Sequence, residues 1–334
     1  MGVVLTLSSA ILCGLVWFVF AGGGIGTVDY PPLHNTITWV AIVSLLTWCL
    51  AIIGWGTIGR PTGVIIDTRN QMSLSRLQAA AWTILVVSAI LTMAMSNIRE
   101  GAATFWEGTK ERLAAREQAA STEDTQEEGL EPAGTEDAQE PGIAKQRKGF
   151  EAISGALEIE VPVEVWSLLG ISTASLAAAG LIKSQKKNDP PNEDNKEVVN
   201  KQFEEEKDKA DANLELQGTS VGNASPDEAK LRDMFTGDEV GSANSVELGK
   251  VQMLIFTVIV LFVYAVMLVG TFWVAEDLKS LPVLTGGIVT FLAISHAGYL
   301  TNKVIPNIPS GATPKGTPED TSGGTPEGTS KGTP

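Results

Sequence analysis

Six stretches of the chain carry no Asp, Glu, Lys or Arg, and hydrophobic residues dominate each of them. They cover residues 2–28, 30–59, 77–98, 165–182, 251–275 and 280–302. A bilayer core of roughly 30 Å is crossed by about 20 helical residues, so each stretch is long enough for a span. Surface helices of soluble proteins carry charges on their exposed face, which these stretches lack. The pattern therefore predicts an all-α polytopic membrane protein with six transmembrane helices, and it excludes a soluble enzyme.

The polar segments between these stretches divide the chain into seven parts. They are a transmembrane hairpin (1–59), a cytoplasmic loop with the third helix (60–96), an acidic extracytoplasmic loop (97–161), the fourth helix (162–183), an acidic cytoplasmic loop (184–249), the fifth and sixth helices (250–303) and a Gly/Thr/Pro-rich tail (304–334). Few large apolar residues occur in the two loops and the tail, and such segments do not bury enough surface to offset the entropy of ordering. We therefore expect them to be disordered.

The net charge of −15 comes from the two acidic loops. Residues 97–161 contain 15 acidic and 7 basic residues, and residues 184–249 contain 16 acidic and 8 basic residues. Neither loop has the basic stripe that phosphate binding requires, so nucleic acid is excluded as a partner. The loops and the tail are instead candidate sites for protein partners.

Basic residues near the helix ends predict the orientation. With the N-terminus inside, eight Lys or Arg side chains fall on the cytoplasmic side and two fall outside. This positive-inside bias predicts an integral protein of the cell membrane with both termini cytoplasmic. The first helix lacks the basic residues that precede a signal peptide, so we interpret it as an uncleaved span, although the sequence leaves cleavage open.

An internal repeat links the third helix to the fifth and the fourth to the sixth. Residues 76–83 and 250–257 share the order base, aliphatic, Gln, three apolar residues, aromatic and Thr. Residues 169–176 resemble residues 292–299 in the same way. Two matches in the same order favour a parallel duplication of a two-helix hairpin, whose copies are related by an axis along the membrane normal.

The candidate functional residues are five of the polar side chains inside the predicted spans: Gln78, Gln252, Ser172, Ser295 and His296. An amide in hydrocarbon needs a hydrogen-bond partner, so Gln78 and Gln252 are expected to bond to each other or to nearby backbone. His296 is the one ionisable side chain deep inside a span, which makes it a functional candidate by default. A single hydrogen bond to a neighbouring carbonyl explains it equally simply.

Small residues recur at four-residue intervals on two of the predicted helices. Gly170, Ala174 and Ala178 share one face of the fourth helix, and Ala293 and Ala297 occupy the matching face of the sixth. Small faces allow helices to approach closely in lipid, so we expect these residues to mediate helix packing and the assembly of a homo-oligomer.

No pattern of catalytic, cofactor-binding or metal-ligating residues accompanies the spans. The sequence contains no Gly-rich phosphate loop, no spaced His and Cys cluster and no intramembrane carboxylate. We therefore interpret the chain as a non-enzymatic membrane scaffold or signalling component, without cofactor or metal. The alternative is a pore or transporter lined by Gln78, Gln252, Ser172, Ser295 and His296. Under both interpretations, the lipid bilayer is an expected partner of the protein.

Overall fold

The computed structural model describes residues 31–123, 141–188, 195–209, 213–274 and 278–304, and it is mostly helical (76%). Within these described residues, four helices are long and apolar enough to cross a membrane, at His34–Ile58, Leu74–Gln118, Val163–Asn188 and Leu248–Val274. The predicted first span lies outside the described residues. The predicted sixth span forms a helix, α8 (Gly286–Val304), which is not one of these four. The structure thus supports four of the six predicted spans.

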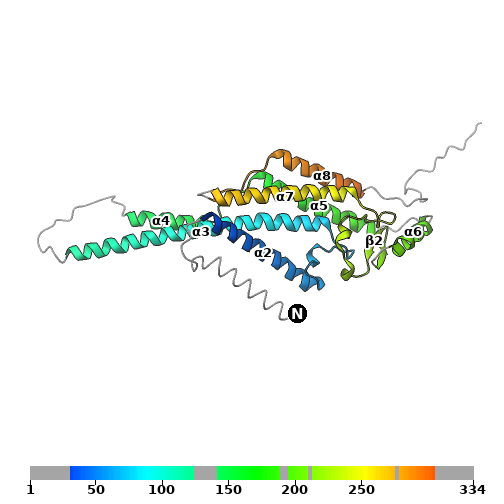
Figure 1. Cartoon of the computed structure of the whole chain (residues 1–334), viewed down its shortest axis with the longest axis horizontal. Helices are drawn as coiled ribbons and strands as arrows, with labels where there is room; N and C mark the ends of the chain where they lie inside the picture. The colour runs from blue at the N-terminus through cyan, green and yellow to red at the C-terminus, as the bar shows by residue number, and fades with distance from the viewer. Residues whose placement is uncertain (1–30, 124–140, 189–194, 210–212, 275–277, 305–334) are drawn as a thin grey trace, which may run out of the picture.

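Four helices pack side by side into a bundle (Figure 1). They are α3 (Leu74–Glu123), α5 (Val163–Asn188), α7 (Leu248–Val274) and α8, and each contacts two of the others. Aromatic side chains fill the interior, where the rings of Trp82 and Tyr264 lie 6.3 Å apart and both residues are buried. The bundle therefore has an apolar core, to which α7 contributes Val260, Tyr264, Leu268 and Phe272.

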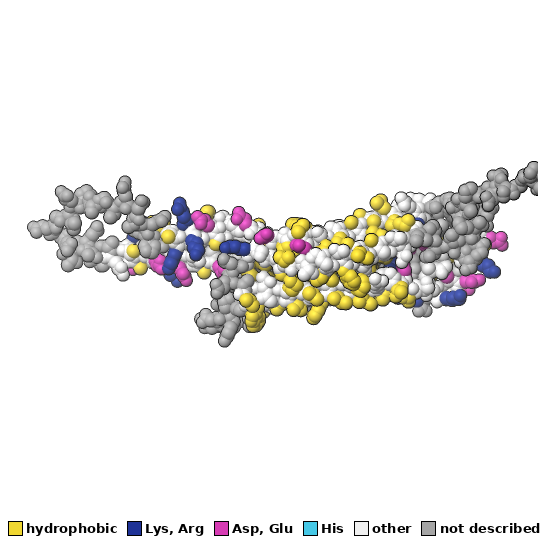
Figure 2. Space-filling view, turned by 90° about the horizontal axis from the view of Figure 1, so that it is seen from above, with side chains coloured by type: hydrophobic (Ala, Val, Ile, Leu, Met, Phe, Trp, Pro, Cys, Tyr) yellow, Lys and Arg dark blue, Asp and Glu magenta, His cyan; other side chains and the backbone are white. Residues whose placement is uncertain are grey.

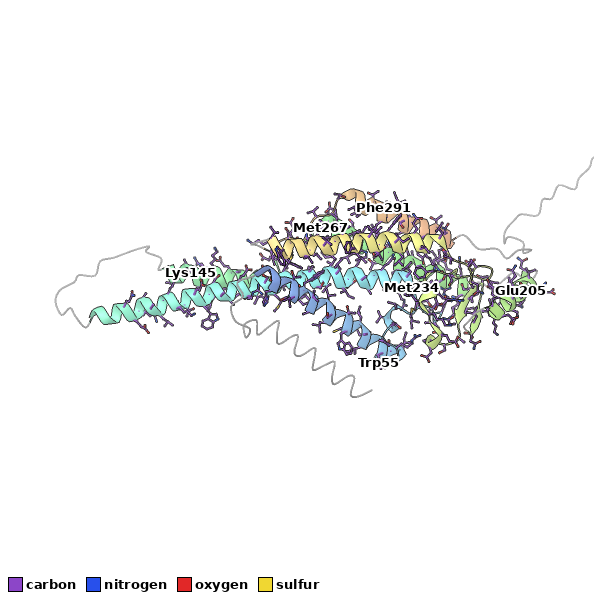
Figure 3. The ribbon with its side chains drawn as sticks, viewed as in Figure 1. Trp55, Lys145, Glu205, Met234, Met267 and Phe291 are labelled. Carbon is purple, nitrogen blue, oxygen red and sulfur yellow. The ribbon has the colours of Figure 1, made fainter. Side chains whose placement is uncertain are left out.

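Helix α2 (Pro31–Ile58) is attached to this bundle mainly at its N-terminal end. There Trp39 packs against Phe272 and donates from its indole Nε1 to Ser88 Oγ at 2.9 Å. The other end of α2 lies away from α3, as the position of Trp55 shows (Figure 3). Consequently α2 and α3 enclose a wedge of space that widens toward Ile58.

The loop after α2 folds back and contacts that helix at a pair of glycines, Gly54 of α2 and Gly63 of the loop. A Cβ added at Gly54 would lie 2.8 Å from Gly63 N, and one added at Gly63 would lie 2.5 Å from Gly54 O. Because no side chain fits between these backbones, both positions require glycine. The contact places the short helix η1 (Gly63–Ile65) against α2 and closes the wide end of the wedge.

Helix α3 also forms an antiparallel hairpin with α4 (Pro141–Ser154). Two glycines on each of these helices allow them to approach closely. Gly101 faces Gly149, and Gly108 faces Gly142, so the close contacts recur every seven residues on both helices. A Cβ added at Gly149 would lie 2.5 Å from Phe105 N. The hairpin extends beyond the bundle at the end opposite η1 (Figure 1).

At the η1 end of the bundle the chain forms a small mixed unit. It consists of α6 (Lys196–Lys209), an antiparallel pair of strands, β1 (Leu214–Gln217) and β2 (Ser220–Asn223), and the short helices η3 (Pro226–Glu228) and η4 (Leu231–Met234). In the strand register Leu214 is opposite Asn223 and Gln217 is opposite Ser220.

The described parts of both acidic loops differ from the expectation of disorder. Residues 97–123 and 141–154 belong to the α3/α4 hairpin, and the small unit buries a core of Val199, Phe203, Leu214, Val221, Val240 and Ala243. The apolar residues are sparse along the chain, but the fold gathers them from distant positions. The tail, and residues 124–140, lie outside the described residues.

Candidate functional site

Six charged side chains meet where the small unit contacts the bundle, and we call them the ion-pair cluster. They are Asp67, Arg69, Lys183, Asp238, Lys250 and Lys303. They come from the loop before α3, the last turns of α5 and α8, the first turn of α7 and a loop of the small unit. The cluster therefore ties the ends of three bundle helices to residues that are distant in sequence.

The loop before α3 owes its shape to Asp67. Its Oδ1 accepts hydrogen bonds from the backbone N–H groups of Arg69 at 2.9 Å and Gln71 at 3.2 Å. The turn includes Asn70 at φ 58°, a left-handed conformation that Asn adopts more readily than most residues. This geometry directs the Arg69 side chain toward the small unit, where its guanidinium donates to the Val221 and Asp238 carbonyls at 3.4 and 3.1 Å.

Asp238 is the centre of the cluster. Its carboxylate lies 2.7 Å from the Arg69 guanidinium and 3.1 Å from Lys250 Nζ, and it also accepts from Lys303. Burial alone would raise the pKa of Asp238, but the charges of Arg69, Lys303 and Lys250 hold it well below its ordinary value. Asp238 is therefore a permanent anion that neutralises several buried cations.

Asp67 plays the same part on the α5 side of the cluster. Its carboxylate accepts from Lys183 Nζ at 2.6 Å and lies 3.4 Å from the Arg69 guanidinium. Burial alone would raise the pKa of Asp67, and the two cations lower it by more, so the pKa lies below its ordinary value. A separate pair, Lys186 with Glu239, extends the contact between α5 and the small unit.

This arrangement holds a rigid junction in place. Arg69, Lys250 and Lys303 are each nearly inaccessible to solvent, with side chains 2 to 4% exposed. Buried charges of this kind are costly unless every partner is present, so the junction requires all its elements to be docked together. The cluster contains four bases and two carboxylates, and Lys250 also pairs with Glu247 at 3.1 Å.

The structure separates the two predicted glutamines. Gln78 is buried and donates from Nε2 to Thr257 Oγ1 at 2.7 Å and to the Met253 carbonyl at 3.4 Å, so it joins α3 to α7. Gln252 is exposed on α7. The expected bond between the two amides is therefore absent within this chain, whereas the bond of Gln78 to the Met253 carbonyl agrees with the backbone alternative. Their different surroundings also give the proposed duplication no support.

Three other predicted polar residues are buried in the bundle. Ser172 lies on the inner face of α5, and Ser295 and His296 lie on α8. Among the described residues, Ser295 Oγ and both His296 ring nitrogens have no hydrogen-bond partner. The predicted bond of His296 to a neighbouring carbonyl is therefore absent from the described structure.

The small residues do not form the contact surfaces within this chain. Gly170, Ala174 and Ala297 are exposed, and Ala178 and Ala293 are partly buried. A Cβ added at Gly170 would meet nothing within 4 Å. The buried face of α5 consists instead of Val165, Leu168, Ser172, Ser175 and Ala179. The prediction that the small faces pack the helices of one chain is therefore wrong, whereas packing between copies stays a prediction.

Sequence reasoning did not find the ion-pair cluster. It interpreted Lys183, Lys250 and Lys303 only as basic residues near helix ends, and it placed Asp238 in a disordered loop. No motif connects these positions, because their partners are far away in the sequence. The ion-pair cluster could have been suspected from one feature of the sequence. The basic helix ends and the acidic loop 184–249 are predicted to lie on the same side of the membrane.

Within the described residues, no group of three or more His, Cys, Asp or Glu side chains is arranged to hold a metal ion. Comparison of the chain with protein-family models, with curated proteins and with solved structures found no match. Its function therefore has to be inferred from the geometry of the bundle and its two ends.

Proposed function

We propose that the protein is an integral membrane scaffold or signalling component, without enzymatic activity, that connects a helical hairpin outside the membrane to a folded unit in the cytoplasm. The single observation that supports this proposal is the continuity of α3. This helix begins beside the ion-pair cluster and extends without a break through the bundle into the α3/α4 hairpin.

The distribution of side chains agrees with a membrane setting. Hydrophobic side chains cover the middle of the molecule, and charged side chains gather toward its two ends (Figure 2). Exposed residues of the middle include Ile255, Ile259, Phe262 and Val266 on α7. An exposed apolar surface of this extent is typical of contact with lipid. We infer both termini to be cytoplasmic from the basic residues near the helix ends.

Partners are proposed for both polar ends and for the bundle itself. The α3/α4 hairpin and the small unit present folded surfaces, which replace the disordered loops that we expected. The outward-facing residues Gly170 and Ala174 on α5 leave space for a second copy of the chain. No cofactor, metal or nucleic acid is part of this proposal.

Cysteine labelling tests the orientation on which the proposal depends. In a background with Cys13→Ser and Cys49→Ser, single cysteines would be introduced as Thr125→Cys, Ala210→Cys and Thr325→Cys. An impermeant reagent is expected to label position 125 in intact cells and positions 210 and 325 only after permeabilisation. The opposite pattern would overturn the orientation and the roles given to the two ends.

The alternative function is a pore or transporter, and one observation favours it. Ser295 and His296 are buried polar residues whose side chains lack partners among the described residues, as groups that line a water path would. Gln252 is exposed and does not belong to such a path. Proton and ion flux into liposomes that contain the purified chain separates the functions. The scaffold is expected to be silent, whereas a flux abolished by His296→Ala would establish the pore.

A further inference from the structure

A cavity of about 760 Å³ lies beside the ion-pair cluster, between α2, α3, α5 and the loop that precedes α3. Leu50 lines it from α2, which diverges from α3 toward this end of the bundle (Figure 1). Two walls are single faces of helices, from Arg76 to Thr83 on α3 and from Thr173 to Lys187 on α5, and Ser73 lines the cavity from the loop before α3. The cavity therefore runs along two candidate membrane spans and begins at their charged ends.

The end of the cavity near the cluster attracts anions. Arg76, Lys183 and Lys187 line it together with one carboxylate, Asp67, which is already paired with Lys183 at 2.6 Å. Among the described residues, neither Arg76 nor Lys187 forms an ion pair with a carboxylate. Arg76 donates to the Ile66 carbonyl at 2.8 Å, which holds its guanidinium in place, and Lys187 is exposed. Two positive charges thus remain for an anionic ligand.

The rest of the cavity is apolar. Ala80 and Leu176 line it from opposite helices, and the two hydroxyl groups at its far end are already satisfied. Thr83 Oγ1 donates to the Ala79 carbonyl at 2.8 Å, and Thr173 Oγ1 donates to the Leu169 carbonyl. Because these donors are used by their own helices, this part of the wall offers hydrocarbon surface rather than polar contacts.

The dimensions match one leaflet of a bilayer. At 1.5 Å per residue, the wall of α5 from Thr173 to Lys187 is about 21 Å long, and that of α3 from Arg76 to Thr83 is about 10 Å long. Half of a hydrocarbon core is about 15 Å thick. A ligand that fills this cavity combines an anionic group at one end with an apolar chain of about that length.

We propose that the cavity binds one anionic phospholipid from the leaflet at the ion-pair end of the bundle. Its phosphate lies between Arg76 and Lys187, and one acyl chain lies along Ala80 and Ala177. A soluble anion would make no use of the apolar wall, and a zwitterionic lipid would bring its own cation close to Arg76 and Lys187, so a lipid with net negative charge fits the two cations better. The proposal requires that the bundle is embedded in a membrane, and it holds for the scaffold and for the pore alike.

Native mass spectrometry of the full chain tests the proposal. The protein would be released from micelles that contain equal amounts of phosphatidylglycerol and phosphatidylcholine with identical acyl chains. The wild type is expected to retain one phosphatidylglycerol in preference to phosphatidylcholine. Lys187→Gln should reduce this preference about fivefold, as one basic side chain near an anionic surface contributes about that much. The exposed Lys201 of α6 provides the matched control, Lys201→Gln, which should keep the preference.

A second pair of variants tests the acyl chain. Ala177→Leu fills the cavity and should abolish retention of both lipids, whereas Ala174→Leu places the same side chain on an exposed position of α5 outside the cavity and should not. If Ala177→Leu lowers the melting temperature of the protein, Ala80→Leu on the opposite wall replaces it. Because Lys187 is exposed, Lys187→Gln should leave folding unchanged, so it tests the proposal even if the alanine variants are unstable.

Three results would overturn the proposal. They are equal retention of the two lipids by the wild type, unchanged retention by Lys187→Gln, and displacement of the lipid by millimolar glycerol phosphate. The last result would show that the site binds a small soluble anion and that the apolar wall contributes nothing.

Discussion

Asn70 and Asn223 donate to each other's backbone carbonyl. Each side-chain Nδ2 lies 2.9 Å from the carbonyl oxygen of the other residue, although 153 positions separate them. The backbone N–H of Asn223 also donates to the Arg69 carbonyl at 2.9 Å. The loop before α3 is thereby attached to the end of strand β2, which fixes where Arg69 enters the ion-pair cluster.

Replacing the central carboxylate of the cluster should destabilise the protein strongly. Asp238→Asn keeps the size of the side chain but leaves Arg69, Lys250 and Lys303 buried without their shared anion. Loss of one partner from a buried ion pair costs about 3 to 5 kcal/mol. The free energy of unfolding in detergent measures this loss. Asp227→Asn, at an exposed position of the same unit, is the control and should change it little.

Because Asp67 and Asp238 are largely buried as anions, the free energy of unfolding should decrease at low pH. The pKa values of Asp67 and Asp238 are lowered in the folded protein, so the unfolded chain binds more protons as the pH falls through about 4, the ordinary range for Asp. Stability is therefore full above that pH and decreases below it, down to the lower folded pKa values. Unfolding measured between pH 7 and 3 should show this decrease. A slope that Asp238→Asn does not reduce would contradict the role of Asp238.

The Gln78 amide is expected to stabilise the contact between α3 and α7 through Thr257. Interhelical hydrogen bonds in membranes contribute typically about 0.6 and at most roughly 2 kcal/mol. A double-mutant cycle with Gln78→Leu and Thr257→Val should therefore give a coupling energy in this range. Gln252→Leu, on the exposed face of α7, should show no coupling to Gln78→Leu. A coupling between the two glutamines would contradict the structure.

The glycines of the α3/α4 hairpin should not tolerate a methyl group. Gly149→Ala places a Cβ 2.5 Å from Phe105 N, so the two helices must separate, at a cost of about 1 to 3 kcal/mol. Hydrogen exchange of the α4 amides should accelerate accordingly. Gly170→Ala, in open space on α5, should instead raise stability by about 1 kcal/mol or less, because Gly is a poor helix former. Equal effects of the two variants would contradict the close contact.

The membrane character of the helices could be predicted from the sequence because it depends on local composition. A charge-free stretch such as residues 251–275 can be recognised directly, and α7 begins three residues before this stretch and ends one residue before its last position. The acidic loops could not be predicted in this way. Phe203 and Val221 are isolated apolar residues in polar surroundings, and only the fold brings them together in one core.

The buried polar residues of the bundle could be predicted for a similar reason, whereas the ion-pair cluster could not. Gln78 and His296 stand out because polar residues are rare in apolar stretches, and both are buried as their positions suggested. Gln252 has the same sequence context as Gln78 but faces outward. Which face of a helix is buried depends on how the other helices pack against it, and the local sequence does not determine that packing. The ion-pair cluster combines ordinary charged residues, whose importance comes entirely from their tertiary partners.

The unbroken course of α3 has a mechanical consequence. A helix of 50 residues is about 75 Å long, and its hydrogen bonds resist bending over that distance. If its base pivots at the ion-pair cluster by about 5°, the tip beside α4 moves by about 6 Å, given that length. Such a rod would turn a small rearrangement of charges at its base into a larger displacement of its tip. Because such coupling is reciprocal, a partner that holds the tip would also bias the charges at the base.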